Sequence, residues 1–238
     1  MILKPWEELP PSLRTEEVRP YYDILCQKKA SLVCKRIFDV TVSALMLILL
    51  LPVFLILAVI IKLDSPGPVF YRQLRVTQYG KTFRIFKFRS MVANADRLGA
   101  QVTMGKDSRV TRVGKVIRKC RLDEICQLID VLRGTMTFVG TRPEVPQYVQ
   151  AYTPEMMATL LLPAGVTSEA SILYKDEAEL LDQAEDVDAV YIQQVLPGKM
   201  RYNLQAVRDF SFWSDIGTMF RTVFAVLGKD YAPDEETN

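Results

Sequence analysis

The sequence of 238 residues contains no histidine. This absence excludes Ser-His-Asp and Cys-His catalytic arrangements, histidine general bases and almost every catalytic zinc site. Any acid–base or nucleophilic chemistry must therefore use Asp, Glu, Lys, Tyr or Cys side chains. With 49% hydrophobic and 24% charged residues, the chain has the composition of a folded protein and not of a disordered one.

Cysteine is also scarce. The four cysteines are Cys26, Cys34, Cys120 and Cys126, and no two of them form a C-x-x-C pair. Without histidine, a zinc site would need all four from distant parts of the chain, so we expect free thiols in a reducing compartment. The N-terminal segment lacks the apolar stretch of a signal peptide, and we expect none.

Long uncharged stretches are absent with one exception, residues 40–61. These 22 residues carry no charge, and as a helix they would be about 33 Å long, enough to cross a bilayer core. A buried helix of a soluble protein is the least favoured interpretation. Pro52 predicts a kink in the middle. Because basic residues flank both ends and prefer the cytoplasmic side, a bent helix that enters and leaves the same leaflet is favoured over a straight span.

The net charge of +2 hides a strongly basic segment. Residues 62–121 hold 15 Lys and Arg against three acids, a local net charge of +12. Such a segment could bind anionic lipid, phosphorylated small molecules or nucleic acid, or could be a solvated surface. Because the basic segment directly follows a membrane helix, we interpret it as a membrane-facing surface that binds phosphates. Nucleic acid is not expected as a partner, because no recognition motif accompanies the charge.

Hydrophobic and turn patterns predict an α/β fold that is mostly helical with a small β element. Strands are expected at residues 69–75 and 82–88, joined by a turn. Helices are expected at residues 93–99, 111–130, 153–162, 176–194 and 210–227. The last helix has a wide aromatic and aliphatic stripe, which is typical of a core or of an amphipathic helix in the lipid interface.

A pair of carboxylates, Asp123-Glu124, falls within the predicted helix 111–130 and closely follows Arg118. A carboxylate can act as a nucleophile towards phosphorus. Basic surroundings would keep it ionised and would stabilise phosphoryl oxygens. Acidic residues are common near helix N-termini because they interact favourably with the helix dipole. The pair therefore indicates catalysis only together with the basic residues around it. Because histidine is absent, a carboxylate nucleophile is the leading candidate.

Two further segments could bind phosphate. Lys87 and Arg89 are two residues apart on a predicted strand, which places them on the same face. Residues 139–143 form a predicted tight turn that presents Arg142, and arginine can bind phosphate oxygens in a bidentate manner. The isolated glycines of these segments match neither a Walker loop nor a dinucleotide fingerprint. Together with the carboxylates, these features indicate a membrane-embedded enzyme that acts on phosphates.

An ordered series of motifs resembles that of the bacterial sugar transferases, the small monotopic phosphoglycosyl transferases. It comprises Lys35-Arg36-x-Phe38-Asp39, the helix interrupted by Pro52, Ser65-Pro66-Gly67-Pro68-Val69-Phe70-Tyr71-Arg72-Gln73, Lys87-Phe88-Arg89-Ser90-Met91, Leu122-Asp123-Glu124-x-x-Gln127-Leu128 and Val139-Gly140-x-Arg142-Pro143. The match runs from Lys35 to Leu227. The chain departs from the usual family pattern at Ile125-Cys126, Asp130 and Thr141, where the family has Leu-Pro, Asn and Pro.

The resemblance implies that a sugar-1-phosphate is transferred from a UDP-sugar to undecaprenyl or another polyprenyl phosphate, with release of UMP. This would be the first membrane step in the assembly of an exopolysaccharide, capsule, O-antigen or glycoprotein glycan. By the same resemblance, Asp123 forms a covalent phosphosugar intermediate, and Glu124 orients the site, helps to hold Mg²⁺ or deprotonates the acceptor. Both carboxylates are the implied Mg²⁺ ligands. The expected phosphate and substrate contacts are Lys87, Arg89, Arg118, Gln127 and Arg142.

The resemblance also implies a monotopic protein of the bacterial inner membrane whose catalytic part faces the cytoplasm. We expect an N-terminal arm (1–34), a re-entrant membrane helix (35–63), a catalytic domain with interface helices (64–228) and an acidic flexible tail (229–238). Expected partners are the donor, the acceptor, anionic membrane lipids, downstream glycosyltransferases and a second copy in a homodimer. Two alternatives stay open: a non-enzymatic membrane scaffold of this fold, and a nucleic-acid-binding membrane protein that would rest on the basic segment alone.

Overall fold

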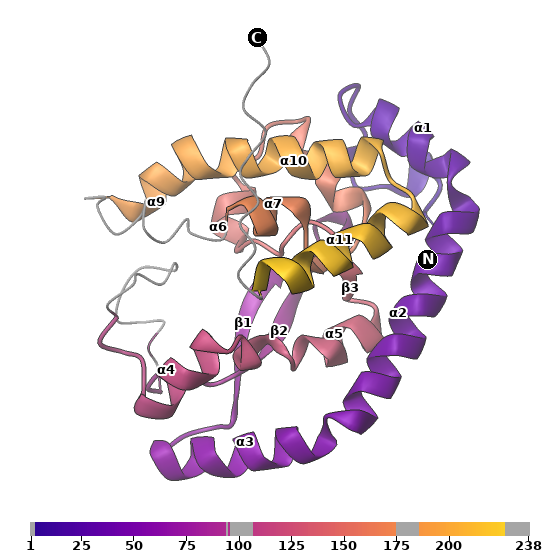
Figure 1. The fold of residues 1–238 in the computed structure, drawn as a ribbon. Coiled ribbons are helices and arrows are strands. Elements are labelled where there is room, and N and C mark those ends of the chain that lie inside the picture. The colour runs from indigo at the N-terminus through magenta and orange to yellow at the C-terminus, as the bar shows by residue number, and fades with distance from the viewer. Residues whose placement is uncertain (1–2, 94, 96–106, 175–185, 227–238) are drawn as a thin grey trace.

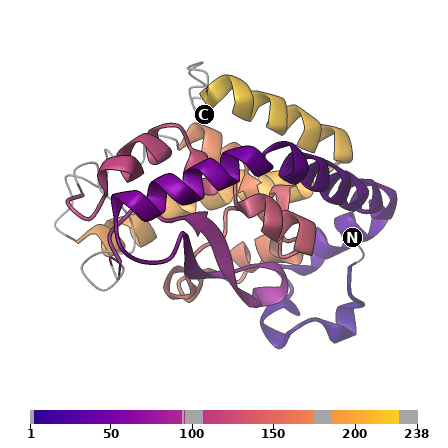
Figure 2. The same cartoon turned by 90° about the horizontal axis from the view of Figure 1, so that it is seen from below.

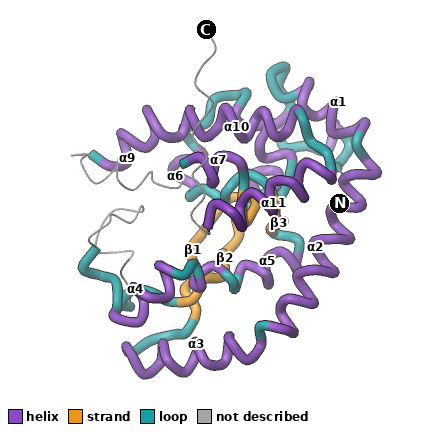
Figure 3. Tube along the Cα trace, viewed as in Figure 1, coloured by secondary structure: helices purple, strands orange, loops and turns teal. Residues whose placement is uncertain are grey.

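A computed structural model describes residues 3–93, 95, 107–174 and 186–226. Two short sheets lie at the centre and helices surround them (Figure 3). The antiparallel sheet pairs β1 (Phe70–Val76) with β2 (Thr82–Phe88), and the parallel sheet pairs β3 (Met136–Val139) with β4 (Ala164–Thr167). The α/β class with a small β element is confirmed.

The helices follow one another as α1 (Arg19–Gln27), α2 (Lys29–Leu49), α3 (Leu51–Asp64), α4 (Arg112–Lys119), α5 (Gln127–Arg133), α6 (Pro146–Val149), α7 (Glu169–Leu173), α9 (Val187–Val190), α10 (Leu196–Arg208) and α11 (Phe212–Val226). Tighter 3₁₀ turns are η1 (Trp6–Glu8), η2 (Pro11–Leu13), η3 (Gln78–Gly80), η5 (Leu122–Glu124) and η6 (Met156–Leu161), and η7 (Tyr191–Val195) is a π-helical turn. In Figure 1, α2 runs down one side of the molecule and α3 lies along the bottom, opposite α10.

The uncharged segment 40–61 forms the second half of α2 and most of α3, and the two helices meet at Leu50 with a bend of 60°. Pro52 lies in the first turn of α3, where its missing N–H costs no helical hydrogen bond. The predicted break near Pro52 is therefore confirmed. No single helix in the described ranges is long and apolar enough to cross a membrane; the bent pair meets this test by length and composition only.

Apolar side chains on this bent pair face away from the protein. Leu49 is 77% exposed and Leu63 is 82% exposed, and most of the aliphatic residues between them are also exposed. Trp213 at the start of α11 is 76% exposed. Figure 2 shows the face on which α3 lies in the foreground. Exposed apolar surface of this extent is typical of a membrane or protein contact, and the stripe of residues 210–227 is thus only partly core.

The start of α2 is fastened to the centre by the Lys35-Arg36-x-Phe38-Asp39 motif. Lys35 is buried, donates to Val139 O at 2.7 Å and forms an ion pair with Asp215 of α11. Arg36 donates to Val131 O and Leu132 O near the end of α5. Asp39 accepts bonds from the Thr137 hydroxyl at 2.7 Å and from a backbone N–H of β3. One motif thus ties the apolar helix to α5, α11 and the strand that precedes Arg142.

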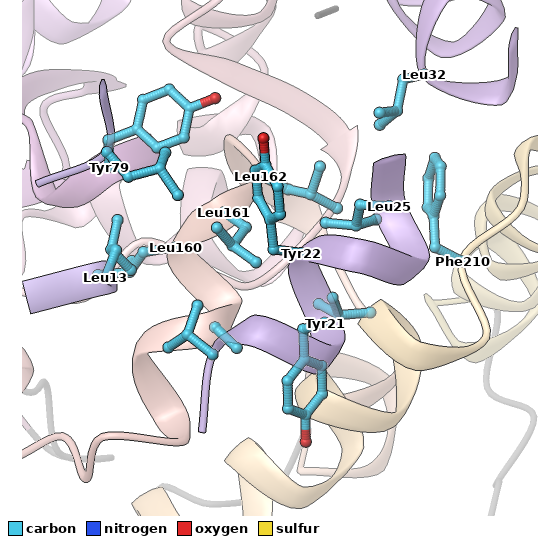
Figure 4. Packing of buried hydrophobic residues seen from close by; sticks show 14 of the residues in the cluster. Leu13, Tyr21, Tyr22, Leu25, Leu32, Tyr79, Leu160, Leu161, Leu162 and Phe210 are labelled. Atoms are coloured by element: carbon cyan, nitrogen blue, oxygen red, sulfur yellow. The ribbon is translucent and has the colours of Figure 1, made fainter. Parts of the chain in front are cut away.

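The N-terminal segment packs into the protein over its described residues. Leu13, Tyr21 and Leu25 are buried in one hydrophobic cluster with residues 160–162 and Phe210 (Figure 4). The Tyr21 hydroxyl also donates to Glu155 at 2.6 Å. The described part of the expected arm therefore belongs to the hydrophobic core.

Most predicted elements within the described residues are present. The hairpin and the helix over residues 210–227 are confirmed within one or two residues. The prediction over 153–162 corresponds to η6, a tighter helix. Most of the predicted helix 93–99, residues 176–185 of the predicted helix 176–194 and the tail 229–238 lie outside the described residues, whereas residues 187–194 are helical as predicted, in α9 and η7. Residues 111–130 are mostly helical, as predicted, but they do not form one helix: α4 ends at Lys119, Arg121 adopts a left-handed conformation (φ 55°), and Asp123-Glu124 lies in the short turn η5.

Candidate active site

The carboxylates occupy η5, a single turn between α4 and α5. After α4 the chain changes direction at Arg121, whose backbone adopts the left-handed conformation. This conformation is unfavourable for a residue with a side chain. A short turn therefore presents Asp123 and Glu124 next to β2, and the predicted helix interior does not exist here.

Glu124 joins two cations from different elements. Lys87 Nζ of β2 lies 3.0 Å from Glu124 Oε1, and Arg142 forms an ion pair with the same carboxylate. The Glu124 side chain is only 14% exposed. Burial alone would raise the pKa of Glu124, but the charges and hydrogen bonds of Arg142 and Lys87 outweigh burial and hold the pKa well below its usual value. Glu124 is therefore ionised and lies in contact with both cations.

Asp123 has a different environment. Burial and the neighbouring Glu124 charge raise the pKa of Asp123, whereas Lys87 and Arg118 lower it, and the net direction is upward. Within the described residues no cation forms an ion pair with the Asp123 side chain. The pKa values of the two adjacent carboxylates are thus shifted in opposite directions. Opposite shifts are typical of sites in which one carboxylate reacts and the other supports it.

The loop that carries Arg142 is fixed by the parallel sheet. Gly140 N donates to Thr167 O at 3.0 Å, and Gly165 N donates to Thr141 O at 2.8 Å. The two glycine backbones nearly touch, since a Cβ on Gly165 would lie 2.1 Å from Gly140 O. This close approach requires glycine and sets where Arg142 leaves the loop.

Two other predicted residues, Arg118 and Gln127, flank the carboxylates in the sequence. The charge of Arg118 lowers the pKa of Asp123. Gln127 opens α5 and is only 1% exposed, and neither polar atom of its amide has a partner among the described residues. Buried amides are nearly always hydrogen-bonded, so this amide is available to a ligand or an ordered water molecule.

Arg89 lies elsewhere. Its guanidinium donates to Ser65 O at 2.6 Å, to Ile61 O at 3.2 Å and to Pro66 O at 3.1 Å. It is 5% exposed and therefore holds the chain that leaves α3. The structure does not bring Arg89 to Glu124, although Lys87 reaches it from two residues away. The strand ends at Phe88, so the alternation on which the prediction rested does not extend to Arg89.

The sequence reasoning missed Arg75, whose side chain reaches the loop of Arg142 by a bond to Pro143 O at 2.9 Å. The signal was present, since Arg75 alternates with Tyr71 and Gln73 along a predicted strand. Arg75 shares a face of the hairpin with Lys87, because Tyr71 pairs with Lys87 and Arg75 is four residues further along the same strand.

The carboxylates fit a Mg²⁺ ion held partly by a substrate. Mg²⁺ commonly binds one or two carboxylates together with substrate phosphates. Glu124 is already occupied by Lys87 and Arg142, whereas Asp123 has no cationic partner in the described part of the chain. No group of three or more His, Cys, Asp or Glu side chains suited to a metal is found among the described residues. Asp123 is therefore the carboxylate that could hold such an ion together with the phosphates of a substrate.

The sequence matches a known protein family over most of its length. The bacterial sugar transferase family model matches residues 30–229. The UDP-N-acetylgalactosamine-undecaprenyl-phosphate N-acetylgalactosaminephosphotransferase of Aeromonas hydrophila is 37% identical over 196 residues, 81% of this chain and 43% of that protein. The UDP-glucose:undecaprenyl-phosphate glucose-1-phosphate transferase of Escherichia coli (strain K12) is 37% identical, over 80% of this chain and 39% of that protein.

The chain thus spans about two fifths of the length of these two relatives. The UDP-glucose:undecaprenyl-phosphate glucose-1-phosphate transferase of Caulobacter vibrioides is 35% identical over 83% of this chain, and 71% of that protein is covered. The family match extends from the start of α2 to the end of α11 and includes every residue around the carboxylate pair. The chain belongs to the bacterial sugar transferase family.

Proposed function

We propose that this chain transfers a sugar-1-phosphate from a UDP-sugar to undecaprenyl phosphate and releases UMP. The observation that carries the proposal is the carboxylate pair, in which Glu124 is paired with Lys87 and Arg142 while Asp123 has no cationic partner among the described residues. The names of the relatives support the donor and acceptor classes. The alternative of a non-enzymatic scaffold explains neither the charge arrangement nor the pKa difference between the two carboxylates.

The proposed reaction has two displacements at one phosphorus. Asp123 Oδ attacks the β-phosphorus of the donor, and the bond from this phosphorus to the bridging oxygen breaks, so that UMP leaves with the electron pair. An oxygen of the acceptor phosphate then attacks the phosphosugar on Asp123 and releases the carboxylate. Lys87, Arg118 and Arg142 would stabilise the phosphoryl oxygens in both steps. Mg²⁺, held by Asp123 and the substrate, would neutralise diphosphate charge when bound.

A panel of radiolabelled UDP-sugars tests this function with the protein in detergent, undecaprenyl phosphate and Mg²⁺. We expect one or a few donors to yield UMP and a lipid-linked product. If no donor yields UMP while the protein remains folded, a scaffold role is the better explanation.

The pKa of Asp123 predicts a distinctive pH profile. Only the ionised carboxylate can attack, and its pKa is raised above the ordinary aspartate value of 3.8. The acid limb of kcat/KM should therefore fall at a pH above the ordinary aspartate range. Arg118→Gln removes a charge that lowers this pKa, so the limb should move to still higher pH. A limb that stays in place or moves down in the variant would contradict the assignment of Asp123.

We also propose that α2 and α3 form a re-entrant hairpin in the inner membrane, with the catalytic part in the cytoplasm. The 60° bend and the exposed apolar side chains support this topology. In a cysteine-free background, Lys28→Cys and Lys81→Cys place exposed thiols before α2 and after α3. A membrane-impermeant maleimide should label both in inside-out vesicles and neither in spheroplasts. Labelling of one site from each side would mean a true span.

A further inference from the structure

The β hairpin presents a second cation on the face that carries Lys87. The antiparallel register pairs Tyr71 with Lys87 and Arg75 with Phe83. Directly paired residues and alternate residues of a strand share one face of a sheet. Arg75 and Gln73 therefore lie on the same side of the hairpin as Lys87, the side that faces Glu124.

The guanidinium of Arg75 is held in one orientation by neutral acceptors. Its Nε and Nη2 lie 3.0 and 2.6 Å from Gln73 Oε1, and its Nη1 lies 2.9 Å from Pro143 O. An arginine carries five N–H donors, so two have no acceptor in the described parts of the chain. No described carboxylate forms an ion pair with Arg75; the nearby Glu144 accepts a bond from the Tyr191 hydroxyl at 2.6 Å.

Arg75 is also partly desolvated. Burial lowers its pKa, the charge of Arg142 acts in the same direction, and Glu144 opposes both. A desolvated cation near other cations is unfavourable unless an anion binds there. An oriented guanidinium with free N–H groups suits an oxygen of a phosphate.

The cations follow a direction away from α3. β1 rises from the end of α3 towards the centre of the molecule (Figure 1). Arg75 is four residues beyond Tyr71, about 13 Å along the strand at ~3.4 Å per residue. Lys87 and Arg118 are the cations that most affect the pKa of Asp123. The charged groups that most affect the pKa of Arg75 are Glu144 and Arg142. Lys87, Arg142 and Arg75 thus lead from Asp123 to the side opposite the apolar helices.

We propose that Arg75 binds the phosphate next to the nucleoside of the UDP-sugar. This inference rests on the proposed function. In phosphoryl transfer the leaving oxygen departs roughly in line with the attacking one, so UMP should lie on the far side of the β-phosphorus from Asp123. Arg75 lies beyond the Tyr71–Lys87 pair along β1, away from α3, and would be on that side of a donor bound at Asp123. The acceptor phosphate offers the same chemistry, but its lipid chain confines it to the side of α3.

Equilibrium binding of UMP and UDP tests the proposal with the full chain in detergent micelles, in an Asp123→Asn background that prevents turnover. Arg75→Gln should lower the affinities for UMP and for UDP by a similar factor of about 10- to 100-fold, because each nucleotide loses a charge-assisted hydrogen bond to the same phosphate. Arg84→Gln is the matched control, since Arg84 is exposed on the opposite face of the same hairpin, and it should change neither affinity. A short-chain polyprenyl phosphate should bind the parent and Arg75→Gln equally.

Arg75→Lys separates binding from support of the loop. Lysine keeps the positive charge but lacks the two-pronged guanidinium group, so the affinity of this variant for UMP should lie between those of the parent and Arg75→Gln. Its thermal midpoint should be near that of the parent. The proposal is overturned if UMP affinity is unchanged in Arg75→Gln, if only UDP or the polyprenyl phosphate is weakened, or if both variants unfold. If the folded parent binds neither nucleotide, the donor class of the proposed function is wrong as well.

Discussion

Asp123→Asn should lower kcat for sugar-phosphate transfer by about 10⁴-fold or more, because a neutral amide cannot replace the carboxylate as a nucleophile. The change is nearly isosteric and leaves Glu124 with Lys87 and Arg142, so the fold should persist. Rates are measured as UMP release in detergent, and the thermal midpoint is recorded alongside. Turnover comparable to that of the parent would show that Asp123 is not the nucleophile.

Asp130→Asn is the matched control within the same segment. Asp130 is buried, and its carboxylate accepts the backbone N–H of Phe86 at 2.8 Å. An asparagine oxygen can accept the same bond, so this variant should keep activity close to that of the parent. Equal losses in the two variants would mean that activity depends on the packing of this segment and not on the chemistry of Asp123.

Lys35→Met should destabilise the protein by about 3–5 kcal/mol, the usual cost when one partner of a buried ion pair is removed. Asp215 would remain largely buried without its cation, and burial already raises the pKa of Asp215. Val139 O would lose its donor at the base of the Arg142 loop. For a chain of this size the thermal midpoint should fall by roughly 6–20 °C.

Lys29→Met provides the comparison. Lys29 is exposed on the same helix, so this substitution should change the thermal midpoint little. Adding Asp215→Leu to Lys35→Met should recover part of the loss, since the unpaired carboxylate is then gone. If Lys35→Met and Lys29→Met unfold at the same temperature, the motif at the start of α2 does not fasten this helix in the way described.

Local patterns predicted the hairpin and the break near Pro52 well. β1 and β2 are adjacent in the chain and are joined by a short turn, and β2 alternates between exposed and buried residues over its first four positions, so local pattern defines the hairpin. Proline is tolerated only in the first turn of a helix, and this preference places a helix start close to Pro52. The stop at Gly134 also follows from a local rule, since its φ of 85° favours glycine.

Elements that depend on distant contacts were not found from the sequence. β3 is buried at all four residues and β4 contains Gly165, so neither shows the alternation of an exposed strand; their pairing joins segments 28 residues apart. α10 begins at Leu196-Pro197-Gly198, a sequence that usually indicates a turn. The turn that presents Asp123 depends on a left-handed arginine, which no composition rule predicts.

The candidate site was predicted in its composition and less well in its geometry. Asp123, Glu124, Lys87 and Arg142 are brought together as expected, because the motif spacing identified them independently of secondary structure. Arg89 was misplaced because a strand periodicity was extended past the end of the strand. The pairing of Glu124 with both cations could not be foreseen, since it depends on how the parallel sheet aims the Arg142 loop.

Intact-protein mass spectrometry after incubation with a competent UDP-sugar, in the absence of polyprenyl phosphate, tests the central claim most directly. The account predicts a gain equal to one phosphosugar, located by peptide mapping on Asp123, lost when acceptor is added and absent from Asp123→Asn. Release of UMP without any adduct, or an adduct on a different residue, would contradict the proposed role of Asp123.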